Sequence, residues 1–374
     1  LEALRKIRAN TSCLLSVVGS IMTPEEAESL LEEGSADLIM LGRSTLADPF
    51  WPVKAQMGHS EDIVPCIRCL QCYHVSTDHK NVQCSVNPRF NREKRVPLIL
   101  PVTGHPKHLV IVGGGPAGIT CALTASRRGH QVTLLEKEPV LTGKLNIACH
   151  GEHKADLRRF RDYLLTQLRK SSVTVHTGVL ADTDVVRGLK PDALVIAVGA
   201  TPSRIPLPGV DGDNCMQISE FLQSPDTSLQ HYIIIGGGSV GCETALDLAE
   251  KGKDVSIIEM ADCLASASND LYRLALSEHF ARYDNLHTYL NSACQSIDAD
   301  GVNVLTNGAS THISGDKVLL SLGFRPDAKQ VSSLYGIVPD TYYVGDCERV
   351  ATVAEAVNNA YFIGANVFQE QDII

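Results

Sequence analysis

Four cysteines between residues 66 and 84 have the spacing of a metal-binding loop. Cys66, Cys69 and Cys72 are each separated by two residues, and Cys84 follows alone after eleven more. Four thiolates suit either a [4Fe–4S] cluster or a structural zinc ion. Zinc ribbons usually place their cysteines in two separated pairs, whereas here three cysteines follow one another and the fourth is isolated. We therefore expect a cluster, with zinc or an unrelated set of cysteines as the alternatives.

Two glycine-rich turns downstream have the pattern of dinucleotide-binding sites. Each follows an apolar run that predicts a strand (108–112 and 232–235) and precedes a predicted helix and a second strand ending in an acid. Glycines permit a tight turn and let a pyrophosphate approach the backbone at the helix N-terminus, while the acid accepts hydrogen bonds from a ribose. The first site would comprise Gly113, Gly115, Pro116, Ala117, Gly118 and Glu136, and the second Gly236, Gly238, Gly241 and Glu259.

The acid that ends the second unit indicates which nucleotide binds there. Glu259 favours a free 2′-hydroxyl and repels a 2′-phosphate, so we expect NADH rather than NADPH. The simpler interpretation of Glu259 is a solvated acid at a strand end, and that of the first motif is a glycine-rich turn. A late strand ends at Gly345 and Asp346, before a helix over 352–367. Asp346 would bind a ribityl hydroxyl of a flavin, or else act as a helix N-cap.

The first 60 residues predict a strand, a helix and a second strand. We expect buried strands at 13–18 and 36–41, joined by a helix that Thr23 caps. Gly19, Gly42 and Arg43 follow the two strands. In a βα barrel, the ends of the last two strands form a phosphate site. A small α/β appendage is the alternative.

Composition limits the classes of partner and compartment. The chain has 374 residues, enough for two or three domains. Its net charge of −10, from 33 basic and 43 acidic residues, argues against nucleic acid or an anionic membrane as partner. No apolar run approaches the roughly 20 residues of a membrane span. Twelve cysteines with one clustered subset fit a reducing compartment, so we expect a cytoplasmic protein.

The order of these patterns predicts five segments. We expect a barrel remnant, a cysteine loop with an exposed linker over 96–106, a first part of a FAD domain, an NADH domain and a second FAD part. Because the chain begins with a leucine, we expect a fragment. The boundaries are 1–60, 61–105, 106–202, 203–326 and 327–374.

The motifs in this order resemble a known family. The segments 112–136, 235–259 and 344–346 resemble the two-dinucleotide flavoprotein oxidoreductases. The segments 41–51, 66–72 and 84–88 resemble the iron–sulfur members of the old-yellow-enzyme group. That group includes 2,4-dienoyl-CoA reductase, 2-enoate reductase, the bile-acid-inducible reductases and trimethylamine dehydrogenase. The resemblance covers essentially the whole chain.

The resemblance implies an α/β fold with two Rossmann-like domains, for FAD and NADH, preceded by the cluster loop and the last strands of a truncated TIM barrel. In the family, NADH reduces FAD, the cluster passes electrons singly, and FMN delivers hydride to an activated C=C bond. The four cysteines would ligate the cluster, the second glycine turn with Glu259 would hold NADH, and Gly19, Gly42 and Arg43 would contact the FMN phosphate. FAD would be held by the first glycine turn and by Glu136, Lys137, Lys144, Leu145, Gly199, Gly345 and Asp346.

Two positions depart from the family pattern. The family often has two glycines where this chain has Thr142 and Gly143. The two-residue gap before Cys72 matches trimethylamine dehydrogenase, whereas dienoyl-CoA reductases tend to have three. The substrate site and proton donor would lie in the missing barrel.

Four alternative functions remain open. A flavin disulfide reductase needs a dithiol after the first glycine turn, where only Cys149 occurs. An NADPH-feeding subunit of a glutamate-synthase-like complex disagrees with Glu259 and with the segment 48–51. The others are a zinc-bearing docking module and an amine-dehydrogenase-like protein with a static ADP in the second site. We expect an NADH-dependent enzyme with a small-molecule substrate, and a homo-oligomer is left open.

Overall fold

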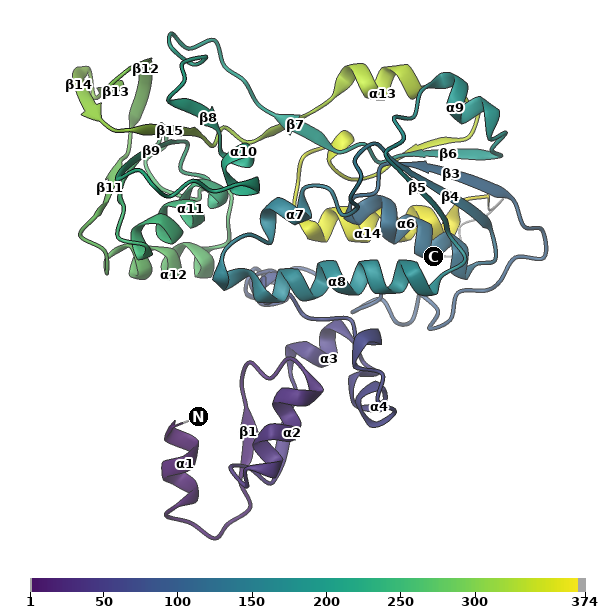
Figure 1. The fold of residues 1–374 in the computed structure, drawn as a ribbon. Helices are drawn as coiled ribbons and strands as arrows, with labels where there is room; N and C mark the ends of the chain where they lie inside the picture. The colour runs from purple at the N-terminus through teal and green to yellow at the C-terminus, as the bar shows by residue number, and fades with distance from the viewer. Residues whose placement is uncertain (1, 369–374) are drawn as a thin grey trace. The chain divides into compact units, whose positions relative to one another are not determined.

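The computed structural model describes residues 2–368, which divide into two compact units. Unit 1 contains residues 2–145, 154–198 and 328–368, and unit 2 contains residues 146–153 and 199–327. Each unit contains a five-stranded parallel sheet (Figure 1). The fold is thus α/β with two Rossmann-like sheets, as the sequence predicts. The division into five segments is not resolved by these units and stays a prediction.

The sheet of unit 1 has the strand order β17-β6-β3-β4-β5. Helices α6 and α14 lie side by side and, with α8, follow one face, while apolar residues of α9 and α13 join the core with strands β3 and β6 (Figure 1). The central strand β3 is completely apolar after its first residue and is buried there. The strands are β3 (His108–Val112), β4 (Gln131–Glu136), β5 (Thr174–Thr177), β6 (Ala193–Ile196) and β17 (Thr341–Tyr343). The helices are α6 (Pro116–Arg127), α8 (Ala155–Lys170), α9 (Thr183–Gly188), α13 (Ala328–Leu334) and α14 (Val353–Asn366).

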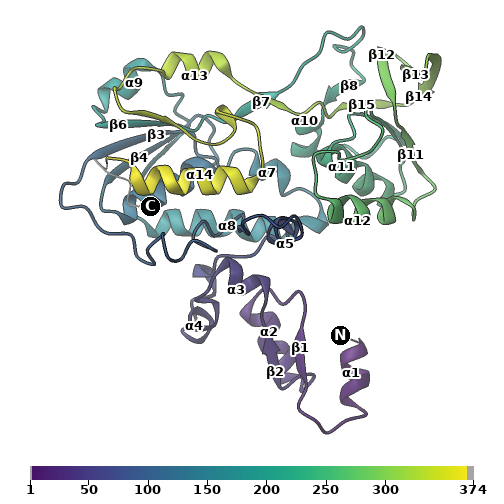
Figure 2. The same cartoon turned by 180° about the vertical axis from the view of Figure 1, so that it is seen from behind.

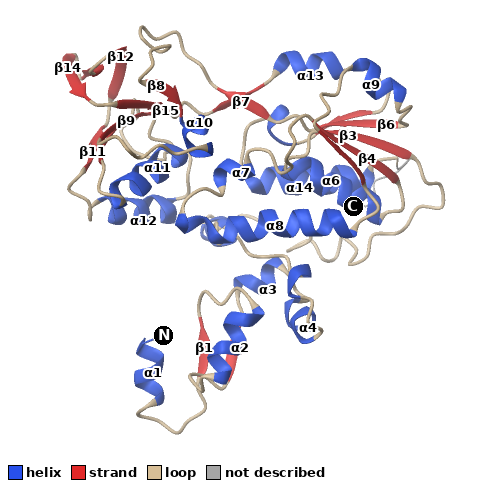
Figure 3. Ribbon diagram, in the orientation of Figure 1, coloured by secondary structure: helices blue, strands red, loops and turns tan. Residues whose placement is uncertain are grey.

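The sheet of unit 2 has the order β11-β10-β9-β15-β8. One core joins it to helices α10, α11 and α12, and a second core joins it to an antiparallel sheet, β12-β13-β14, whose strands are red in Figure 3. The strands are β8 (Cys215–Gln217), β9 (His231–Ile235), β10 (Asp254–Ile258), β11 (Leu286–Tyr289), β12 (Ser292–Asp298), β13 (Gly301–Thr306), β14 (Ala309–Ser314) and β15 (Lys317–Leu320). The helices are α10 (Ile218–Gln223), α11 (Ser239–Glu250) and α12 (Asp270–Phe280). Strands β7 (Ala200–Pro202) and β16 (Phe324–Pro326) pair antiparallel at the two ends of the long segment of unit 2.

The first 62 residues form the expected strand–helix–strand unit, shown from behind in Figure 2. Strands β1 (Ser16–Val18) and β2 (Leu38–Met40) pair in parallel. Thr23 caps α2 (Pro24–Glu32) through a complete capping box with Glu26, as predicted. The expectation of buried strands is wrong, because no described element covers the outer face of this two-stranded sheet and its alternate side chains are exposed. The other elements are α1 (Glu2–Arg8), α3 (Arg43–Ala47), α4 (Trp51–Gln56) and η1 (Ser60–Asp62).

The connector before the first glycine turn is not an exposed linker throughout. Val96 and Leu100 are buried, and Arg128 donates hydrogen bonds to the carbonyl oxygens of Pro101 and Ala365. Two apolar anchors and a buried guanidinium therefore hold the connector. The remaining elements are α5 (Gln71–Thr77), α7 (Leu145–Ala148), η2 (Glu152–Lys154) and η3 (Gly345–Cys347). Among residues 2–368, no helix has the length and apolarity that crossing a bilayer requires.

Candidate functional site: two nucleotide turns and a cysteine hollow

The first glycine turn joins β3 to α6. Gly113 has φ +114°, and a Cβ added there would lie 2.2 Å from the carbonyl oxygen of Ala197. A Cβ at Gly118 would lie 1.9 Å from the carbonyl oxygen of Gly113. These two glycines are therefore required by the fold. A Cβ at Gly115, in contrast, would meet no atom within 4 Å, so the space in front of this residue is open.

Glu136 holds this turn from the end of β4. Its Oε2 accepts a 2.6 Å hydrogen bond from the backbone N–H of Gly114, and its Oε1 accepts a 2.9 Å bond from that of Glu138. The carboxylate is buried. Its charge lies at the N-terminus of a helix of twelve residues, where anions are stabilised. Pro116 opens the helix and Ala117 is buried in its first turn, whereas Lys137 is exposed.

The second glycine turn repeats this geometry in unit 2. A Cβ at Gly236 would lie 2.3 Å from the carbonyl oxygen of Ser321, and one at Gly241 2.2 Å from that of Gly236. Gly238 faces open space, as Gly115 does in the first turn. The two turns thus share one backbone geometry, in which the same two glycines are obligatory and the same one faces open space.

Glu259 takes the place of Glu136 in this second turn. Its Oε2 accepts a 2.7 Å hydrogen bond from the N–H of Gly237, and its Oε1 a 2.8 Å bond from that of Ala261. The carboxylate is half-buried. Glu259 is therefore not simply a solvated acid at a strand end, because it holds the turn whose open face lies at Gly238.

Asp346 lies against the first nucleotide helix. A Cβ added to the preceding Gly345, which has φ +74°, would lie 2.9 Å from Cβ of Ala117. The carboxylate of Asp346 forms an ion pair with Lys144 and accepts a 3.1 Å hydrogen bond from the N–H of Ala351. Since Thr352 is the N-cap of α14, the interpretation of Asp346 as that cap is wrong.

Three neighbouring residues complete the description of the first site. Leu145 is buried at the start of α7, and Gly199 lies between β6 and β7 with φ +73°. Thr142, the departure from the family pattern, also has φ +73° and donates its backbone N–H to the carbonyl oxygen of Gly114 at 2.7 Å. This left-handed conformation explains why glycine suits that position in the family.

The four cysteines line one hollow. Cys66 and Cys69 come from the loop before α5, Cys72 from its first turn, and Cys84 from the loop beyond it. The backbone between the first three is left-handed at Arg68 (φ +47°) and Leu70 (φ +57°), which lie between right-handed or extended neighbours. Such alternation can direct successive N–H groups into a concavity that suits an anionic group, including iron–sulfur sites. The other residues that line the hollow are Arg43, Leu46, Ile67, Leu70, Ser85 and Val86.

The separation of the thiol sulfurs differs from that of ligands gathered around one zinc ion. Four thiolates about one zinc ion, at about 2.3 Å each, would hold their sulfur atoms about 3.8 Å apart. Among the described residues, the sole triad of His, Cys, Asp or Glu whose donor atoms all lie within 4.8 Å of one another is His59, Glu61 and Asp62. No three of the four thiol sulfurs therefore lie as close to one another as the ligands of one zinc ion would. Lys170 pairs with both carboxylates of this triad at 2.7 Å and so offsets part of their negative charge.

Burial keeps several of these thiols protonated when no metal is bound. Burial raises the pKa of Cys84 to about 11, although hydrogen bonds from the backbone N–H groups of Val86 and Asn87 act to lower that pKa. Burial also raises the pKa of Cys66 and Cys72, while Arg43 opposes this shift at both thiols. Metal binding must therefore release protons, and the same N–H groups and guanidinium would then stabilise thiolate charge.

Arg43 therefore lies at the cysteine hollow. Gly42, exposed, is the residue before α3, and Gly19 has φ +121° after β1. The sequence did not indicate that Arg43 lies beside the cysteines, whereas in the structure it lines their hollow. Contact of these three residues with an FMN phosphate stays a prediction.

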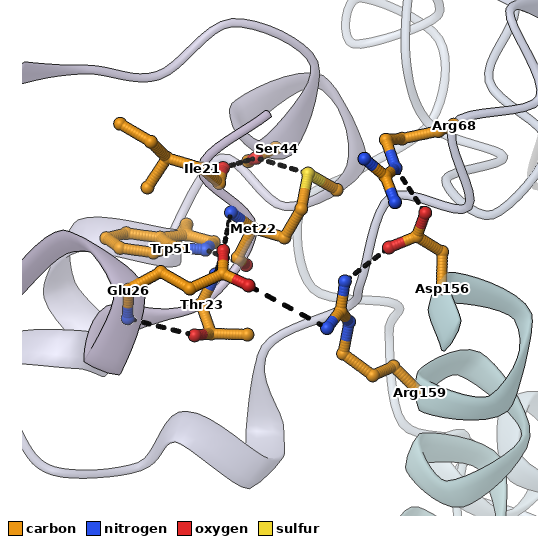
Figure 4. A network of polar contacts seen from close by, with 9 residues as sticks. All are labelled: Ile21, Met22, Thr23, Glu26, Ser44, Trp51, Arg68, Asp156 and Arg159. Atoms are coloured by element: carbon orange, nitrogen blue, oxygen red, sulfur yellow. Dashed lines mark hydrogen bonds and ion pairs between the residues drawn. The ribbon is translucent and has the colours of Figure 1, made fainter. Parts of the chain in front are cut away.

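A polar network anchors the cysteine loop to α8 (Figure 4). Arg68, between the first two cysteines, pairs with the buried Asp156, which also pairs with Arg159. Arg159 lies 3.9 Å from the carboxylate of Glu26 on α2, so the network joins the loop, α8 and the N-terminal segment. These contacts could not be predicted from the sequence, because the partners are far apart in the chain.

We expect Asp156→Ala to lower the free energy of unfolding by about 1–3 kcal/mol, because it leaves two arginines without their shared carboxylate. The side chain of Asp156 is 8% exposed. Asp162→Ala is the matched control, since that carboxylate is 60% exposed in its pair with Arg161 and its loss should change stability by less than about 0.5 kcal/mol. Urea unfolding of both variants measures the difference, and equal effects would contradict an anchoring role for Asp156.

Two family models match the chain. The pyridine nucleotide-disulphide oxidoreductase family matches residues 107–360, and the NADH:flavin oxidoreductase / NADH oxidase family matches residues 2–62. The second match identifies the N-terminal strand–helix–strand unit as part of a flavin oxidoreductase rather than an unrelated appendage.

Curated relatives and solved structures agree with these matches. The chain is 34% identical to an NADH oxidase of Thermoanaerobacter brockii, covering 92% of this chain and 54% of that one. It is 33% identical to a bilirubin reductase of Mediterraneibacter gnavus, covering 97% and 56%. A structure of 2-naphthoyl-CoA reductase matches with a TM-score of 0.92 and 27% identity, covering 98% and 56%. The chain thus spans about half the length of these relatives.

Proposed function

Because the chain belongs to the NADH:flavin oxidoreductases of the old-yellow-enzyme type and carries a pyridine nucleotide-disulphide oxidoreductase domain, we propose that it is the electron-input portion of such an enzyme. It would accept reducing equivalents from NADH at the second glycine turn, bind FAD at the first, and pass single electrons through a [4Fe–4S] cluster. The complete enzyme would deliver them through FMN to an activated C=C bond.

The observation that carries this proposal is the hollow in unit 1 that four cysteines line. The first glycine turn belongs to the same unit. A disulfide reductase would have no use for four thiols spread around one space. FAD, when bound, can accept a hydride and release electrons one at a time. Gly115 would leave room for its pyrophosphate, Glu136 would hold the turn and accept from its ribose, and Asp346 with Lys144 would form the polar end of the site.

The names of the relatives support the class of acceptor. Besides the bilirubin and 2-naphthoyl-CoA reductases, a cinnamate reductase of Clostridium sporogenes is 28% identical over 93% of this chain. Cinnamate is an enoate, whose C=C bond is activated by the adjacent carboxylate. We therefore propose enoates or their thioesters as acceptors of the complete enzyme.

We expect NADH to reduce the bound FAD with a kcat/KM at least about tenfold above that of NADPH, because the carboxylate of Glu259 repels a 2′-phosphate. Glu259→Gln removes the charge but retains an oxygen that can accept the hydrogen bond from Gly237. The ratio of kcat/KM for NADH to kcat/KM for NADPH should therefore fall by about tenfold. Asp284→Asn, which removes an exposed carboxylate elsewhere in unit 2, is the control.

Anaerobic stopped-flow bleaching of FAD with each nucleotide measures these preferences. An unchanged preference in Glu259→Gln would remove Glu259 from the specificity site. FAD that NADH leaves oxidised in the native chain would instead favour a static nucleotide in the second site, as in the amine-dehydrogenase alternative.

A further inference from the structure

The fourth cysteine is attached to α14 by a buried amide. Asn358 is 7% exposed, and its Nδ2 donates to the carbonyl oxygen of Cys84 at 3.1 Å and to that of Ala354 at 2.9 Å. An amide in such a place is costly unless its polar atoms are bonded. The bond to Ala354 lies within the helix, whereas the bond to Cys84 reaches a residue 274 positions away in the chain.

Arg92 completes the attachment on both flanks of Cys84. Its Nη1 donates to Oδ1 of Asn358 and to the carbonyl oxygen of Pro88, each at 3.0 Å. Its Nη2 donates to Oε1 of Gln83 at 3.4 Å. The guanidinium therefore joins the residues on either side of this cysteine to the same helix.

A second contact holds Arg92 on α14. Its guanidinium carbon lies 5.0 Å from the centre of the ring of Phe362, one turn beyond Asn358. A planar guanidinium can form several directed bonds while its face rests on an aromatic ring, which a lysine cannot reproduce. The loop of Cys84 is thus fixed to α14 by the amide of Asn358 and by the guanidinium of Arg92, which also rests on the ring of Phe362.

The same helix begins at the flavin end of unit 1. Its N-cap is Thr352, and the N–H of the preceding Ala351 donates to Asp346. Asn358 follows Thr352 by six residues, which corresponds to about 9 Å along the helix axis. One short rigid element therefore carries both the polar end of the first nucleotide site and the attachment of the fourth thiol.

We propose that Asn358 and Arg92 are positioning residues that set the place of the Cys84 thiolate relative to the flavin-binding end of α14. The inference rests on the proposed function, because it assumes a cluster at the four cysteines. The pair contributes no ligand and acts through the backbone on either side of Cys84. Its removal should loosen the fourth ligand while FAD binding and the first three cysteines are retained.

Asn358→Asp is the sharpest test, because it retains the size of the side chain and an acceptor for Arg92 but removes the donor to Cys84. Arg92→Gln removes the guanidinium that bonds Asn358 and the residues on either side of Cys84. Arg95→Gln is the control, since it removes the same charge from an exposed side chain in the same loop. The whole chain is purified anaerobically, and we measure the electron paramagnetic resonance spectrum of the reduced cluster and the rate of iron release to a chelator.

We expect Asn358→Asp and Arg92→Gln to shift the g values and to release iron about tenfold faster, with FAD content unchanged and Arg95→Gln like the native chain. Native spectra and release rates in both variants would overturn the inference, and if Asn358→Asp does not fold, Arg92→Gln decides alone. A native chain without iron would instead refute the proposed function, so the two failures are distinguishable.

Discussion

Gly238→Ala should fold, retain FAD and reduce that FAD with NADH at least about 100-fold more slowly than the native chain. An added Cβ meets no atom within 4 Å, and the residue has an ordinary φ of −68°, so the protein itself tolerates the change. The methyl group would occupy the space into which we expect the pyrophosphate of NADH to move. A displacement of about 1 Å of the reacting groups is enough for an effect of this size.

Two other glycines make the result specific. Gly188→Ala is the matched control, because this residue also faces open space and has no left-handed conformation, but ends α9 and belongs to neither turn. Gly115→Ala should produce the opposite pattern, with FAD lost from the purified chain. Rates are measured by anaerobic stopped-flow. A native rate in Gly238→Ala would show that the second turn does not bind the reducing nucleotide.

Cys84→Ala should abolish the cluster while NADH still reduces FAD. This thiol is the buried member of the set, and its loss removes one of four ligands from the hollow. Iron should fall from about four per chain to well below one after gel filtration, and the signal of the reduced cluster should disappear. Cys13→Ala is the control, since that cysteine is exposed and outside the hollow.

Metal and flavin assays on the same samples decide this prediction. Native iron content in Cys84→Ala would exclude this residue as a ligand. One equivalent of zinc in the native chain, with no iron, would restore the zinc-bearing docking module as the better interpretation. Loss of FAD reduction together with the iron would show a wider structural role for this cysteine.

The nucleotide turns could be predicted because their determinants are local. The strand, the glycines and the acid follow one another within about 25 residues, and each glycine has a steric reason that adjacent backbone imposes. Helix α6 begins at Pro116, directly after the last open glycine, so the same short segment also sets the N-terminus of the helix. Both turns could therefore be located from the sequence alone.

The properties that depend on distant partners could not be predicted. Strands β1 and β2 are apolar except for Ser16, and nothing local shows that one face would lack a covering element. The contacts of Arg68 with Asp156 and of Arg92 with Asn358 span 88 and 266 residues. Spacing alone indicated the four cysteines as one site, but the helices that hold them came only from the fold.

The most direct test of the central claim is an anaerobic titration of the native chain with NADH, followed by visible absorption and electron paramagnetic resonance together. If the chain is an electron-input module, FAD will bleach, and a cluster signal accounting for about one spin per chain will appear as NADH is added. If FAD bleaches without any cluster signal although about four irons are bound, or if NADH leaves both centres oxidised, the proposed path from NADH to the cysteine hollow is wrong.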